Sequence, residues 1–256
     1  MTSQQNPIRA TVFGAAIGLF ACVGAAPGAA VAQTSGAPAN YVTLLGIPSA
    51  TVAPGGTAFG ALSLANKRIA PGPRSDGSLA FGLGLGSAED SVGVQMTAHI
   101  TSLTDSFGDS GYFEIKASRR IADGNAPTYL SFALSGAGYG DAKTRETAAT
   151  VALTSFRQVR FSDGGDLYPV MFTLGAGTNR RNNESDAGIF GGVGIGVTPN
   201  MGLSAAWSGE YVNLGAAFRF DGFENFSVSA AVYDAFDQKD SRRIGVSFVY
   251  VLQDLF

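Results

Sequence analysis

The last stretch of the chain, residues 243–252, alternates between two kinds of side chain. One face is apolar throughout and becomes aromatic toward its end: Ile244, Val246, Phe248, Tyr250 and Leu252. The opposite face begins with Arg243, Gly245 and Ser247. Alternation over about ten residues predicts a β-strand. Such a strand is longer than the roughly 5–6 residues usual in soluble sheets, and it matches the roughly 9–11 residues of a tilted membrane-spanning strand.

The composition favours a surface that does not wholly face water. Charged residues make up 14% of the chain, against about 25% in an ordinary soluble domain. After residue 25, however, no apolar run approaches the roughly 20 residues of a membrane helix. A closed barrel is then the remaining way to pair every backbone group within lipid. The alternative is a secreted β-sandwich. A net charge of −3 argues against a nucleic-acid partner.

Segments of this alternating kind recur from residue 56 onward, separated by turn residues, as is typical of a membrane barrel. They predict an all-β fold, an antiparallel transmembrane up-and-down β-barrel of about 12 strands. The predicted strands are 57–66, 78–86, 91–103, 111–121, 128–140, 146–158, 168–178, 187–198, 202–209, 210–220, 226–236 and 243–252. A very short connection at 208–210 and a long one at 159–167 leave ten or fourteen strands open.

The alternation also predicts which polar side chains face the lumen. These are Gln95, His99, Glu114, Lys116, Arg120, Asn213, Arg219 and Arg243. We expect ion pairs between neighbouring strands in this set, because an unpaired buried charge is costly. The set either fills and stiffens a small barrel or forms a charged constriction in a water-filled pore.

The C-terminal strand and the pattern upstream resemble the bacterial outer-membrane β-barrel proteins. In that family the final aromatic residue, here Phe256, belongs to a C-terminal signal that the barrel-insertion machinery recognises, and Phe248 and Tyr250 match the same signal. The resemblance implies an outer-membrane location in contact with lipid, with both barrel ends of the chain in the periplasm. It leaves the oligomeric state open. Residues 46–50 and 53–57 are also weakly similar to the start of barrels associated with exopolysaccharide export.

The N-terminus predicts processing. An apolar stretch at 11–26 precedes Ala30-Val31-Ala32, an A-x-A cleavage site, so residues 1–32 are expected to be a signal peptide cut after Ala32. Residues 19–22 also resemble a lipoprotein box, which would make Cys22 a lipidated N-terminus. Residues 33–55 are rich in Gly, Pro and Ala and are expected to be an irregular periplasmic lead-in with a short strand at 41–47. Residues 56–256 form the predicted barrel.

The chain offers little for catalysis. His99 is its only histidine and is followed two residues later by Thr101, where outer-membrane acyl hydrolases carry a serine. Ser102 points to the opposite face, so this spacing does not place a serine nucleophile within hydrogen-bond reach of His99 as its base. We therefore predict no enzyme activity, no metal and no cofactor. Two glycine-rich runs, 79–86 and 189–197, favour a crowded lumen over a phosphate cradle, because a turn at Pro199 follows where a helix would be needed.

Aromatic residues gather at the strand ends and predict an interfacial girdle. Its members are Phe107, Tyr112, Tyr129, Tyr139, Phe161, Tyr168, Tyr211, Phe220, Phe223, Phe226, Tyr233, Phe236 and Phe256. The sequence as a whole predicts a small pore or passive conduit for small solutes. The alternative function is a closed structural or adhesive barrel whose outer loops bind a partner.

Overall fold

The computed structural model describes residues 30–32, 41–67, 75–101, 103–104, 107–140, 142, 147–163, 165–181 and 186–255. Within these residues no helix is long and apolar enough to cross a membrane. Phe256 and most of the predicted signal peptide, including Cys22, lie outside the described residues.

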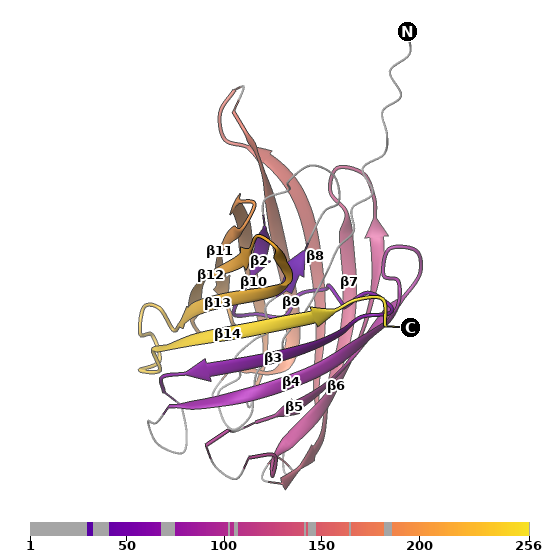
Figure 1. Cartoon of the computed structure of the whole chain (residues 1–256). Helices are drawn as coiled ribbons and strands as arrows, with labels where there is room; N and C mark the ends of the chain where they lie inside the picture. The colour runs from indigo at the N-terminus through magenta and orange to yellow at the C-terminus, as the bar shows by residue number, and fades with distance from the viewer. Residues whose placement is uncertain are drawn as a thin grey trace.

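Twelve antiparallel strands form a closed barrel in chain order (Figure 1). They are β3 (Ala58–Ala65), β4 (Asp76–Gly86), β5 (Gly93–Ile100), β6 (Gly111–Ala122), β7 (Thr128–Tyr139), β8 (Ala148–Arg160), β9 (Leu167–Arg181), β10 (Asp186–Thr198), β11 (Met201–Trp207), β12 (Val212–Phe220), β13 (Phe223–Tyr233) and β14 (Arg243–Leu252). The last strand, β14, pairs with the first, β3, from Gly245 with Ala65 to Leu252 with Ala58. The predicted fold class and the count of twelve are confirmed.

The two connections that left the count open now have a physical explanation. Residues 208–211 make a tight loop between β11 and β12. Gly209 takes a φ of 116° there, which a side chain would disfavour. On the other connection, β8 and β9 pair as far as Arg160 with Leu167, so the predicted stretch at 159–167 is shortened to a turn at 161–166.

The barrel has two unlike ends. The loop end carries the connections 66–75, 101–110, 140–147, 182–185, 208–211 and 234–242. The turn end carries the connections 87–92, 123–127, 161–166, 199–200 and 221–222, together with the start of β3 and the end of β14. Short turns at one end and longer loops at the other are the usual asymmetry of a membrane barrel.

The outer wall is apolar at mid-strand, with Phe81 52%, Phe132 50% and Leu174 63% exposed. The predicted girdle is only partly right. Its phenylalanines, such as Phe161 and Phe223, are exposed, whereas Tyr112, Tyr129, Tyr211 and Tyr233 are buried. Tyr129, Tyr211 and Tyr233 face inward and pack in the apolar clusters of the lumen, and the Tyr211 hydroxyl accepts a hydrogen bond from Arg243 there.

The described part of the predicted lead-in, residues 41–55, lies elsewhere than expected. Residues 41–57, termed the lumen segment, are almost wholly buried inside the barrel. Within the segment, β2 (Val42–Leu44) contacts β9, β10, β11 and β12 (Figure 1). The expectation of a lead-in outside the barrel is therefore wrong for these residues. Their backbone groups find partners inside the wall instead of in water.

A short strand, β1 (Ala30–Ala32), pairs antiparallel with β2, so Ala30 and Ala32 of the predicted cleavage site lie on it. Cleavage after Ala32 stays a prediction. It would remove β1 and leave β2 in place.

Candidate functional site: the filled lumen

The lumen segment is held by side chains of the inner wall that bind its backbone. Leu45 N donates to Ser204 Oγ at 3.2 Å, Ala50 N to Thr154 Oγ1 at 2.8 Å and Ala53 N to Gln95 Oε1 at 2.9 Å. These residues lie on β11, β8 and β5. A buried backbone amide must find such a partner, so the polar residues of the wall allow an irregular chain to lie inside.

Carbonyl groups of the segment are bound in the same way. Asn213 Nδ2 donates to Gly46 O at 3.1 Å, and Lys116 Nζ donates to Thr51 O at 3.1 Å and to Ser49 O at 3.5 Å. Ser118 Oγ donates to Ala50 O. Side chains of five strands, β5, β6, β8, β11 and β12, thus bind the backbone of the segment.

Apolar contacts complete the packing in two clusters. Leu44 and Ile47 pack with Tyr129, Met171 and Phe190 on one side of the lumen. On the other side Leu45 packs in a second cluster that includes Tyr211, Tyr233 and Val249. Burial of this apolar surface favours the segment inside the barrel over the segment in water.

Glycines of the inner wall make room for the segment. A Cβ atom at Gly194 would collide with the carbonyl of Thr43, and one at Gly84 would collide with the carbonyls of Ala53 and Pro54. These glycines belong to the two glycine-rich runs of the sequence. The sequence predicted a crowded lumen at these runs, and at Gly84 and Gly194 the lumen segment is what crowds it.

The structure brings together five of the eight predicted lumen residues as fully buried side chains: Gln95, His99, Lys116, Asn213 and Arg243. The other three, Glu114, Arg120 and Arg219, are half-buried on the same inner face. Gln95, Lys116 and Asn213 bind the lumen segment directly. Arg219 contacts the ring of Tyr41 in the segment, and the other four belong to the wall around it.

The partners of these side chains differ from the expected ion pairs between strands. Arg120 pairs with Asp123 of the following turn at 2.7 Å. His99 stacks on Tyr112 of β6, with ring centres 4.4 Å apart. Lys116 binds backbone carbonyls of the lumen segment. The sequence could not reveal these carbonyls, because nothing in it placed residues 41–57 inside the barrel.

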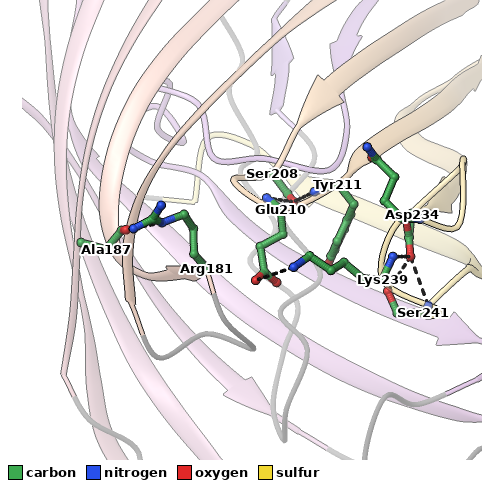
Figure 2. A network of polar contacts seen from close by, with 9 residues as sticks. Arg181, Ala187, Ser208, Glu210, Tyr211, Asp234, Lys239 and Ser241 are labelled. Atoms are coloured by element: carbon green, nitrogen blue, oxygen red, sulfur yellow. Dashed lines mark hydrogen bonds and ion pairs between the residues drawn. The ribbon is translucent and has the colours of Figure 1, made fainter.

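Arg243 closes the loop end of the lumen. Its guanidinium lies 5.0 Å from the ring centre of Tyr233 and 5.8 Å from that of Tyr211. Its Nη2 donates to Tyr211 Oη at 3.2 Å. At the same end of the barrel, Glu210 and Lys239 pair at 3.9 Å between the loops 208–211 and 234–242 (Figure 2). The two loops are thereby tied to each other.

Sequence reasoning missed a further inward-facing cation, Arg180 on β9. Strict alternation would place Arg180 on the outer face. Asn179 has a φ of 56°, and the register of β9 with β10 shifts next to it. This bulge turns Arg180 inward, where its guanidinium lies 5.1 Å from the Phe190 ring centre and donates to Thr150 Oγ1 at 3.0 Å. In the sequence, the only available sign of this bulge was the pair Asn179-Arg180 near the end of a regular alternating strand.

Asp234 organises the loop 234–242. Its carboxylate accepts hydrogen bonds from Gln238 N at 2.6 Å, Lys239 N at 3.0 Å and Ser241 N at 3.1 Å, and from Ser241 Oγ at 2.9 Å (Figure 2). Asp234 N in turn donates to Asn213 Oδ1 at 3.3 Å. Asn213 therefore bridges this loop and Gly46 of the lumen segment.

We expect the loop to loosen in acid. Burial raises the pKa of Asp234, but hydrogen bonds from Lys239, Ser241 and Gln238 lower it more, so the pKa lies below its ordinary value. The stabilisation is then complete above the ordinary pKa of about 3.9 and is lost as the pH falls through the lower folded value. Amide proton resonances of Gln238, Lys239 and Ser241 should shift together with a midpoint below about 3.9. A midpoint at or above that value would contradict the structure.

The residues considered for catalysis make other contacts in the structure. Thr101 Oγ1 donates to Ser110 O at 3.1 Å, while the ring of His99 lies against Tyr112. Among the described residues, no group of three or more His, Cys, Asp or Glu side chains could hold a metal ion.

The C-terminal strand presents Phe248 and Tyr250 on the outer face, half-buried and 50% exposed, respectively. Recognition of these residues by insertion machinery stays a prediction.

Two solved structures are similar in fold. An outer-membrane channel from Pseudomonas putida F1 aligns with a TM-score of 0.47 and 11% identity, covering 78% of this chain and 97% of that one. The outer-membrane protein Omp33 from Acinetobacter baumannii aligns with a TM-score of 0.45 and 10% identity, covering 77% of this chain and 97% of that one. No protein-family model matches the sequence, and no curated protein is significantly similar to it.

Proposed function

We propose that this protein is an integral outer-membrane β-barrel that conducts small solutes when the lumen segment leaves the barrel. The closed ring of twelve strands supports a membrane location, because it pairs its backbone internally and turns apolar side chains outward. The turn end, where both ends of the barrel chain lie, then faces the periplasm.

The observation that carries the proposal is that the wall strands and the lumen segment are hydrogen-bonded in different ways. The wall strands are joined by continuous ladders, such as eight successive pairs between β13 and β14. The lumen segment is joined to the wall mainly by single side chain to backbone hydrogen bonds. The weaker attachment can be released while the wall stays closed, and the wall it leaves behind carries glycine and polar side chains between its two apolar clusters.

A closed structural barrel is the second candidate. The two apolar clusters inside the lumen favour it, because a permanent core would be packed in this way. In that case the loops 208–211 and 234–242, tied by Glu210 and Lys239, would be the part that contacts a partner.

A reversible tether separates the two candidates. Leu45 and Gly215 suit a cysteine pair, because a Cβ atom at Gly215 would lie 3.0 Å from the Cβ of Leu45. A disulfide needs about 3.5–4.5 Å, which a shift of roughly half an ångström provides. With Leu45→Cys and Gly215→Cys, we expect low conductance in planar bilayers when oxidised and higher conductance after reduction.

The wild-type protein treated with the same reductant is the control, since Cys22 is the only cysteine of the chain. Equal conductance before and after reduction, in a barrel shown to be folded by its altered gel mobility without boiling, would favour the closed structural barrel.

A further inference from the structure

Two basic side chains of the wall hold the lumen segment. Lys116 Nζ lies 3.1 Å from Thr51 O, and the guanidinium of Arg219 lies 4.4 Å from the ring centre of Tyr41. Lys116 is 3% exposed on β6, and Arg219 is half-buried near the turn end of β12. Both cations are therefore covered by the segment.

The segment satisfies these cations without neutralising them. Residues 41–57 contain no Asp, Glu, Lys or Arg. Their contribution to Lys116 is carbonyl oxygens, and their contribution to Arg219 is an aromatic ring. When the segment leaves, the two positive charges stay on the inner wall and lose their neutral partners.

Further cations lie on the described inner wall. Arg243 and Arg180 lie toward the loop end. The acidic residues closest to the two cations are Glu114, next to Lys116 on the same face, and Glu224, near Arg219. Asp76 is engaged at the loop end by Thr104 Oγ1 at 2.9 Å and Leu103 N at 3.2 Å. Cations thus lie at several depths of the lumen, from Arg219 near the turn end to Arg243 near the loop end, and one carboxylate lies near each of Lys116 and Arg219.

We propose that the open conduit selects small anions, with Lys116 and Arg219 as the residues that determine this selectivity. The inference rests on the proposed function, since it requires the lumen segment to leave. An oxygen of a small carboxylate or inorganic anion can accept from Lys116 Nζ as Thr51 O does. The charge of that anion adds an attraction that the neutral carbonyl lacks, and charge-assisted hydrogen bonds are roughly twice as strong as neutral ones.

The test measures the reversal potential in a potassium chloride gradient, using the reduced Leu45→Cys, Gly215→Cys protein as the open form. We expect chloride to permeate better than potassium. Lys116→Gln and Arg219→Gln should each lower the ratio of chloride to potassium permeability by roughly two- to fivefold, the effect of one charge at about 4 Å in a water-like lumen. Lys116→Arg keeps the charge and should retain the ratio.

Arg119→Gln is the matched control, because Arg119 lies on β6 with its side chain exposed on the outer wall. It should leave the ratio unchanged. Conductance that prefers potassium, or a ratio that Lys116→Gln and Arg219→Gln leave unaltered, would overturn anion selection while the conduit stands. Absence of conductance in every folded, reduced variant would overturn the proposed function itself.

Discussion

Replacing Gly194 with valine should expel the lumen segment and open the barrel. Gly194 lies on β10 opposite β2, and a Cβ atom there would collide with the carbonyl of Thr43. Overpacking of this kind costs about 1–3 kcal/mol. Because each 1.4 kcal/mol is a factor of ten in an equilibrium, the ratio of open to closed barrels should rise by roughly 5- to 150-fold. Single-channel conductance in planar bilayers measures this ratio.

Gly191→Ala is the matched control on the same strand. A Cβ atom at Gly191 would lie 3.5 Å from Leu174 Cδ1, an ordinary contact with an outer-wall side chain, and 3.2 Å from Thr173 O. We expect almost no change in conductance. If Gly194→Val instead prevents folding, as judged by gel mobility with and without boiling, the segment is a permanent part of the core and the conduit proposal fails.

Replacing Leu174 with arginine should oppose insertion of the barrel into a bilayer. Leu174 lies midway along β9 with 63% of its surface exposed. On the lipid face near the midplane an arginine costs about 2–4 kcal/mol. The same change on a surface facing water stays within about 0.5 kcal/mol. The midpoint of urea unfolding in lipid vesicles should therefore fall clearly, which a secreted β-sandwich would not show.

Phe107→Arg controls for the added charge. Phe107 is as exposed as Leu174, at 63%, but lies in the connection 101–110 at the loop end. Its replacement should leave the unfolding midpoint nearly unchanged. Equal midpoints for the two variants would argue that the outer wall of β9 does not face lipid.

The barrel wall was predictable because its signal is local. Alternation at spacings of two, as in Phe113, Ile115 and Ala117 against Glu114 and Lys116, specifies both a strand and its two faces. Register and closure follow once one face must be apolar. The predicted strand boundaries differ from the structure by at most three residues, and the last strand, 243–252, matches at both ends.

The contents of the lumen were not predictable in the same way. Residues 41–57 lack a clear alternation, and their Gly and Pro residues are also typical of an exposed connection. What places the segment inside is complementarity with distant residues, such as Ala50 with Thr154 and Leu45 with Ser204. In the sequence of the wall, this packing is reflected by Gly84 and Gly194, which leave room for the segment. They indicated a crowded lumen but not what crowds it.

The attachment of the lumen segment has a mechanical consequence. Backbone hydrogen bonds hold the C-terminal end of the segment, residues 55–57, next to the ladder of β3. Gly55 N donates to Gly86 O at 2.8 Å, Gly84 N to Thr57 O at 2.9 Å and Leu255 N to Gly56 O at 2.9 Å. A force applied to the chain before Tyr41 would break the segment's contacts one after another. The force would then act on residues 55–57, where several hydrogen bonds must break together. A tethered partner could thus draw the segment out by small successive forces, and the hydrogen bonds at residues 55–57 would resist further pulling before the wall opens.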